Sequence, residues 1–318
     1  MSGLTRLIVR RIVAVPLVVL GVIFVVFVAI DLSPNDPSTA VLGTFASKEA
    51  QQQFAAEHGL DDPLPVRFVR FLGDLPKGDL GSSVVRPEEV TTMIGQALPV
   101  TLQLTGLAMV IAIVVSLALG TVGALHRDRW PDAVARGFSA GGLAVPDFWL
   151  GILAIQFIAV KWRLLPSGGY VSFGEDPVQW LRSLILPASV LAVPVAAALT
   201  AVVRAAVVRE LDRDYVRTAR GNGLPMRAVV GSHVLRNAML APLTVVGVRA
   251  GYLLGGAIIV ESIFGIPGMG TVLVNGIQQG DLAPVRGVAI VGALLFVTVN
   301  LIVDVLYLLL NPKLRHTA

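Results

Sequence analysis

The sequence predicts an all-α integral membrane protein with six transmembrane helices. Of its 318 residues, 55% are hydrophobic and only 14% are charged, whereas soluble domains have about 45–50% apolar and about 25% charged residues. The charged residues cluster between apolar runs that approach or exceed the roughly 20 residues an α-helix needs to cross the hydrocarbon core. A soluble globule of this size could not cover its surface with so few charges.

Six apolar runs are the predicted spans. The first is too long for a signal-peptide core and no small-residue cleavage site follows it, so we expect it to be retained. The third is interrupted by Pro146 and Asp147. In chain order the spans are 12–30, 98–125 within the uncharged stretch 90–125, 137–160, 183–203, 240–260 and 287–310.

The distribution of lysine and arginine predicts the orientation. With the N-terminus inside, the cytoplasmic segments hold 15 of the 25 basic residues, the outer segments hold nine, and Arg249 lies within a span. Positive charge is enriched on the cytoplasmic side of membrane proteins. We therefore expect both termini in the cytoplasm.

Two connections are longer than turns, so the chain divides into a first helix (1–30), an extracytoplasmic cap (31–95) and a five-helix core (96–318). The cap has a net charge of −5 and a predicted helix over 47–59. The inner loop 204–238 is charged and interrupted by Gly221, Gly223 and Pro225, which predicts a helix, a break and a second helix lying across the membrane mouth.

Motifs for catalysis and for binding metals, nucleotides or nucleic acids are absent or out of context. No lysine follows a glycine, so there is no phosphate-binding P-loop, and the four histidines are scattered. The basic residues form no single stripe for nucleic acid. A G-x-S-x-G match at 137–141 opens a span instead of a strand–turn–helix, so we expect its glycines to serve helix packing. We predict no catalytic residue, no metal and no cofactor in this chain.

Ionisable residues within spans are costly and call for a partner. Asp147 caps a helix after Pro146 or lines a pathway, and Asp304 lies near the inner interface. Arg249 requires a partner carboxylate or a place inside a dimer interface. Two acids and one base, each in a different span, do not form the connected series of ionisable groups that an ion-coupled carrier needs.

The inner loop contains Asp214-Tyr-Val-Arg-Thr-Ala-Arg-Gly-Asn-Gly223-Leu-Pro, followed by His233-Val-Leu-Arg-Asn-Ala238. It resembles the cytoplasmic EAA loop of ABC importer permeases, in the version found in the dipeptide/oligopeptide binding-protein-dependent transport family. Further resemblances follow in order along the chain: Asp36-Pro37, Gly59-Leu-Asp-Asp-Pro-Leu-Pro65, Gly78-Asp-Leu-Gly-Ser82, Pro146-Asp-Phe-Trp-Leu-Gly151, Glu261-Ser-Ile-Phe-Gly-Ile-Pro-Gly-Met-Gly270 and Asn300 to Pro312. Three positions depart from the family pattern, namely Gly221, Asn222 and Pro242.

The resemblance implies the MetI-like permease fold, a location in the cytoplasmic (inner) membrane of a bacterium, and a function. Two different permeases would form one pathway, two ATP-binding subunits would dock below and hold ATP and magnesium, and an external solute-binding protein would deliver peptides. The residues expected to couple the ATPases, through a helix over 211–224, are Asp214, Tyr215, Val216, Ala219, Gly223 and Leu224. The residues expected to line the pathway or gate are Asp147, Glu261, Pro267 and Gly268, with 265–281 forming a short re-entrant or external segment.

Three alternatives remain open from the sequence. The same permease architecture could import nickel or another small solute, since the binding protein largely sets the choice. A self-sufficient channel or ion-coupled carrier would not use ATP. A membrane scaffold that binds cytosolic proteins through 204–238 would transport nothing.

Overall fold

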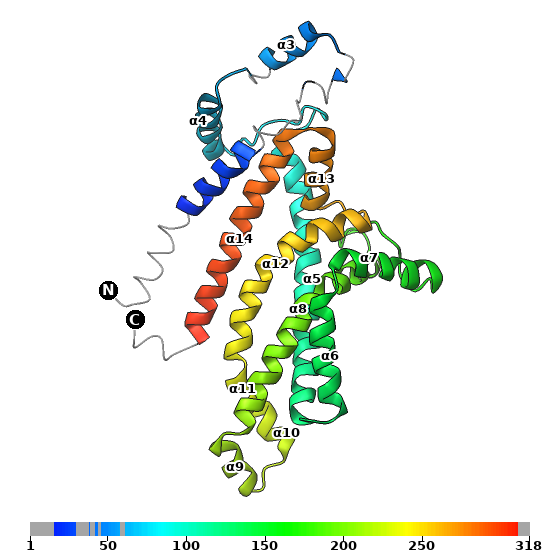
Figure 1. Ribbon diagram of the computed structural model, residues 1–318, viewed down its shortest axis with the longest axis vertical. Helices are drawn as coiled ribbons and strands as arrows, with labels where there is room; N and C mark the ends of the chain where they lie inside the picture. Colours follow the sequence, from blue (N-terminus) through cyan, green and yellow to red (C-terminus); the bar gives the residue numbers. More distant parts are fainter. Residues whose placement is uncertain (1–15, 30–37, 39–41, 44–45, 58–60, 311–318) are drawn as a thin grey trace, which may run out of the picture.

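The computed structural model describes residues 16–29, 38, 42–43, 46–57 and 61–310, with the side chains of 240 and 304–310 excepted. Within these residues the chain is helical, apart from loops and one isolated β-bridge between Ser82 and Glu89. Short helices lie at both ends of a bundle of long helices: α3 (Lys48–Glu57) and α13 (Met269–Gln279) at one end, and α9 (Asp214–Gly221) at the other (Figure 1).

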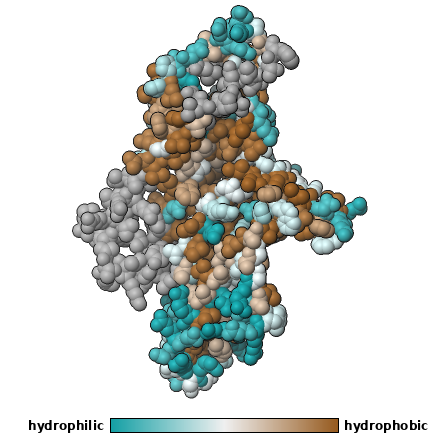
Figure 2. Space-filling model, in the orientation of Figure 1, coloured by the Kyte–Doolittle hydropathy of each residue, from teal (hydrophilic) through white to brown (hydrophobic). Residues whose placement is uncertain are grey.

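Four helices are long and apolar enough to cross a membrane, and these are α5 (Val90–Leu125), α8 (Pro177–Leu211), α12 (Leu240–Phe264) and α14 (Leu282–Leu310). They correspond to predicted spans two, four, five and six. Side chains along the bundle are mainly apolar, whereas the end formed by α9 is hydrophilic (Figure 2). The protein is therefore a multi-pass membrane protein. Of the first predicted span, only the helix Pro16–Ala29 is described, so that span remains a prediction.

The core forms where α5 packs along α8, the most extensive helix–helix contact among the described residues. Small residues of α8, including Ala188, Ala192 and Ala196, are buried and allow close approach. Gly137 and Gly141 have no neighbouring atom of this chain within 4 Å of where a Cβ would lie, so the expected packing is not seen among the described residues. Instead the adjacent Gly142 lies against Ala197.

The third predicted span is not one straight helix. It consists of α6 (Trp130–Ala144), then α7 (Asp147–Ala154) and the π-helix η2 (Ile155–Lys161), and the two parts meet at 104°. Pro146 explains the break, because proline lacks an N–H and forces the preceding Val145 into extended backbone (φ −93°, ψ 126°). As a result α7 points sideways from the bundle (Figure 1).

The inner loop begins later than predicted, because α8 continues to Leu211 and so includes Arg204. The reason is a buried ion pair. Asp132 of α6 has a side chain with no exposed surface, and its two oxygens accept hydrogen bonds from the Arg204 guanidinium, of which Nη2 lies 2.8 Å from Oδ2. The charge of Arg204, which suggested a loop, instead joins α8 to α6.

In the cap region, α3 occupies the predicted helix and a second helix, α4 (Leu64–Asp74), follows it, continued by η1 (Leu75–Lys77). Phe68 and Phe71 of α4 pack against Phe27 of the helix Pro16–Ala29, with ring centroids 5.3 and 5.9 Å apart. The guanidinium of Arg286 in α14 lies 4.9 Å from the centre of the Phe27 ring. The boundaries at 31 and 95 remain predictions.

We expect Asp132→Ala and Arg204→Ala each to lower the thermal stability of the protein in detergent. The first leaves Arg204 without its ion-pair partner, and the second leaves the buried Asp132 with Arg136, at 3.6 Å, as its only ion-pair partner among the described residues. The double variant should be more stable than the sum of the two losses predicts, with a coupling of about 1–3 kcal/mol. Purely additive losses in this double-mutant cycle would contradict an energetic role for the pair.

Candidate functional site

The end of the bundle opposite α13 has the predicted helix–break–helix form. The first helix, α9, spans Asp214–Gly221 and is shorter than the predicted 211–224. Gly223 follows in the left-handed region (φ +82°), where a residue with a Cβ would be strained. The second helical part comprises α10 (Met226–Val229), η3 (Val230–Val234) and α11 (Leu235–Ala238).

One face of α9 is anchored to its own chain. Val216 is buried in a cluster with α8 and η3, and Ala219 packs against this cluster. The Tyr215 hydroxyl donates to Glu210 Oε2 of α8 at 2.9 Å and accepts from Asn237 Nδ2 of α11 at 3.4 Å. Burial raises the pKa of Tyr215, so the hydroxyl remains protonated. α9 is thereby fixed to both α8 and α11.

The predicted coupling residues therefore fall into two groups. Asp214, Gly223 and Leu224 are exposed, whereas Tyr215 and Ala219 are half-buried and Val216 is inaccessible to a partner. Arg217 and Arg220 are exposed on the outer face of α9. Leu224 and Met226 add exposed apolar surface beside these arginines. A surface that combines basic and apolar side chains in this way suits contact with another protein.

At the opposite end, Glu261 holds the short segment after α12 in place. Its carboxylate is fully buried and accepts from Thr101 Oγ1 and from the backbone N–H of Gly270, both at 2.7 Å. The Thr101 hydroxyl in turn accepts from the N–H of Met269 at 2.9 Å. Gly268 lies directly on the Glu261 carboxylate, where a Cβ would clash. The start of α13 is thus tied to α5 and α12.

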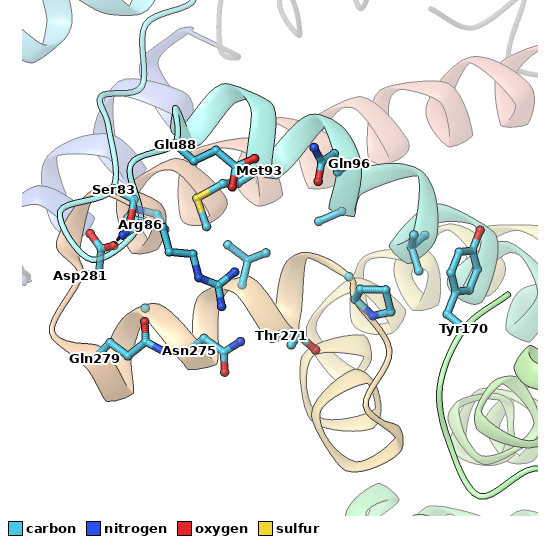
Figure 3. Close-up of a pocket in the computed structure, with 17 residues that line it drawn as sticks. Ser83, Arg86, Glu88, Met93, Gln96, Tyr170, Thr271, Asn275, Gln279 and Asp281 are labelled. Atoms are coloured by element: carbon cyan, nitrogen blue, oxygen red, sulfur yellow. Dashed lines mark hydrogen bonds between the residues drawn. The ribbon is translucent and has the colours of Figure 1, made fainter. Parts of the chain in front are cut away.

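A cavity of about 410 Å³ lies between α13 and the start of α5. Arg86 extends across its opening, and polar side chains from both helices surround it (Figure 3). Asp281 is buried at its edge, where it accepts a hydrogen bond from the Ser83 hydroxyl and a second from the N–H of Val84 at 3.3 Å. The cavity can bind a polar group from outside. The polar residues that line this cavity and are labelled in Figure 3 include Arg86, Glu88, Gln96, Tyr170, Thr271, Asn275 and Gln279.

Three of the four predicted pathway or gate residues lie together here. Pro267 and Gly268 line the cavity, and Glu261 lies beneath them. Asp147 does not join them. It lies at the elbow between α6 and α7, where it lines a second, half-open cavity together with Arg249. Within the described residues, no group of three or more metal-binding side chains is close enough to hold an ion.

Sequence reasoning missed Thr101, Ser83 and Asp281. Thr101 and Glu261 are 160 residues apart, and nothing local marks them as partners. The only available signal was Gly280, followed by the isolated acid Asp281. Glycine is common just after the end of a helix, and Gly280 follows an amphipathic segment.

Comparison with known proteins gives a consistent result. Residues 112–316 match the family described as binding-protein-dependent transport system inner membrane component. Residues 4–105 match the N-terminal family of the same transport-system membrane components. Together the two matches cover nearly the whole chain.

Curated relatives are similar along their full length. A putative peptide transport system permease protein of Brucella abortus (strain 2308) is 39% identical over 98% of this chain and 100% of its own. A glutathione transport system permease protein of Pectobacterium atrosepticum is 36% identical over 97% of this chain and 98% of its own. A probable D,D-dipeptide transport system permease protein of Escherichia coli K12 is 35% identical over 94% of each chain.

We expect Thr101→Val to destabilise the protein, because valine has the same shape but leaves the Met269 N–H and one Glu261 oxygen without a partner. The expected cost is about 1–3 kcal/mol, measured as a shift of thermal unfolding in detergent. Thr105→Val, one turn along α5, is the matched control, since the Thr105 hydroxyl bonds only carbonyls of its own helix. Equal effects of the two substitutions would contradict the role assigned to Thr101.

Proposed function

Because the chain belongs to the family of binding-protein-dependent transport system inner membrane components, we propose that it forms half of a membrane pathway for importing peptides. As a member of this family, it is a permease subunit of a binding-protein-dependent ABC importer and not itself an enzyme. The relatives named for peptides, a D,D-dipeptide and glutathione support peptides as its substrate class. Nickel or another small solute is the alternative that an uptake assay would identify.

The complete transporter contains, in this proposal, a second and different permease, two ATP-binding subunits and an extracytoplasmic solute-binding protein. ATP and magnesium bind to the ATP-binding subunits. The chain spans the cytoplasmic membrane of a bacterium six times in the MetI-like fold, with both termini and α9 in the cytoplasm. The excess of arginine from α8 to α11 supports this orientation.

The exposed face of α9, together with Leu224, is the proposed docking surface for an ATP-binding subunit. The single observation that supports it best is the division of residues 214–224 into an exposed side and an anchored side. Asp214, Gly223 and Leu224 are free to meet a partner, while Tyr215, Val216 and Ala219 hold the helix to α8 and α11. A force applied to α9 is therefore passed to a long helix of the membrane bundle.

The segment 265–281 is the proposed outer gate. It closes the bundle next to the 410 Å³ cavity, whose polar lining suits contact with a binding protein or an arriving solute. Glu261 acts from below by holding the first turn of α13. Pro267 and Gly268 form the rim of this gate.

An ion-coupled carrier or channel would function alone, and a scaffold would transport nothing. Purification of the tagged chain from native membranes in mild detergent separates these possibilities. We expect a second permease and ATP-binding subunits to be recovered with it. Recovery of the chain without any ATPase would contradict the proposal and favour the carrier.

Gly223→Arg should leave membrane insertion intact while abolishing peptide uptake and the stimulation of ATP hydrolysis. Arginine at φ +82° is strained and places a long charged chain on the docking surface. Uptake of labelled peptide and ATPase activity of the purified complex are the measurements.

Gly78→Arg is the matched control for this variant. Gly78 has nearly the same backbone conformation (φ +78°) and equally open surroundings, but it lies in the outer cap. It should therefore retain the ATP-binding subunits on purification. If Gly223→Arg takes up peptide as well as the original protein does, α9 is not the docking element.

A further inference from the structure

A second cavity, of about 430 Å³, lies along α12 at the elbow between α6 and α7. Arg249 is nine residues from the start of α12, which places it about 14 Å along the helix. Arg249 is therefore well inside the helix, away from both of its ends. Its lining residues are 143–148 of the elbow, Pro194 of α8, and Arg249, Tyr252 and Ile259 of α12.

Two opposite charges line this cavity without pairing with each other. The Asp147 carboxylate lies against α12, with Oδ2 3.3 Å from where a Cβ on Gly256 would be. The Arg249 guanidinium lies over the Tyr252 ring, 5.6 Å from its centre. In the part of the chain that the structure describes, neither charged group has an ion-pair partner. Unpaired charges at this depth require a partner or a water-filled path.

The exposed face of α12 is also unsuited to lipid. Its exposed positions are Thr244, Val248, Tyr252, Gly255, Ile259 and Ser262, a mixture of small, polar and apolar residues. In contrast, the exposed face of α14, as far as its side chains are described, consists of Leu294, Phe296, Thr298 and Ile302, of which only the threonine is polar. Small and polar residues are enriched where membrane helices face other helices or a cavity. The α12 face therefore borders protein or a pathway.

We propose that this cavity is a binding site for the two charged ends of a transported peptide. Arg249 pairs with the terminal carboxylate, Asp147 pairs with the terminal ammonium group, and the Tyr252 ring packs between them. This inference depends on the proposed function, since it names the position at which the imported peptide is held within the membrane.

Dimensions and chemistry both support a short peptide. Arg249 and Gly256 are seven residues apart, or about 10 Å along α12, and an extended chain spans about 3.3–3.6 Å per residue. A cavity whose two charged residues are held at these backbone positions has room for a short peptide. A guanidinium and a carboxylate are complementary to its two free ends. A neutral solute would pair with neither charge, and a bare cation or anion would pair with only one of them.

Cysteine labelling tests whether the cavity is wet and occupied. The chain contains no cysteine, so Ile259→Cys introduces a single thiol at the cavity, and Ile302→Cys on α14 is the matched control. In the assembled transporter, a hydrophilic thiol reagent should modify residue 259 much faster than residue 302. A transported dipeptide, added with binding protein and ATP, should slow this modification. Equal, slow labelling at both positions would overturn the inference.

Peptides with blocked ends test the assignment of each charge. We expect Arg249→Gln to reduce uptake of a free dipeptide by about tenfold or more, but uptake of its C-terminal amide by less than about twofold. Asp147→Asn should do the same for the free and N-acetylated forms. Each comparison uses the same two peptides with the original permease and with the variant. Any preference of the binding protein therefore affects both measurements equally.

Charge-conserving variants guard against simple misfolding. Arg249→Lys and Asp147→Glu should retain most of the uptake and the preference for free ends, while Arg182→Gln, an exposed arginine outside the cavity, should resemble the original protein. If the original transporter takes up no peptide with ATP, the proposed function fails. If it takes up peptides, but blocking either end has the same effect in every variant, the terminus site alone is refuted.

Discussion

The close packing of α8 against α5 is the interaction on which the other features depend. Lipid offers no hydrogen bonds to polar groups, so helices that face it must fit together through small side chains and pair their own polar groups. The alanines of α8 permit this fit, and three other elements then use α8 as a support. Asp132 of α6 pairs with its Arg204, the elbow cavity opens at its Pro194, and Tyr215 of α9 bonds its Glu210.

The long apolar helices could be predicted from the sequence because hydrophobic length is a local property. The runs at 98–125, 183–203, 240–260 and 287–310 all lie within single helices. The angle at Pro146 could not be predicted, since a proline marks a break without setting its direction. The continuation of α8 past Arg204 also required knowledge of Asp132, 72 residues earlier in the chain. A charged residue such as Arg204 suggests a loop only as long as its ion-pair partner is unknown.

Prediction of the site was limited by the same difference between local and distant information. The turn after α12 was visible in its glycines and proline, but Thr101, which bonds both Glu261 and the start of α13, was not. On α9, the motif identified the helix without separating inward from outward residues. The spacing of Tyr215, Val216 and Ala219 would have grouped them on one face, and the structure shows them packed against α8 and η3. The shared cavity of Asp147 and Arg249 required the folded chain.

α8 is a single long helix, so a small bend within it would produce a large displacement at its end. Pro194 lies within the helix, where a missing N–H leaves a point of easier bending. From there to Leu211 the helix runs about 25 Å, and α9 is fastened at its far end. A tilt of roughly ten degrees at Pro194 therefore displaces α9 by about 4 Å. Since the same proline is part of the elbow cavity wall, a bend at Pro194 would move α9 and reshape the cavity together.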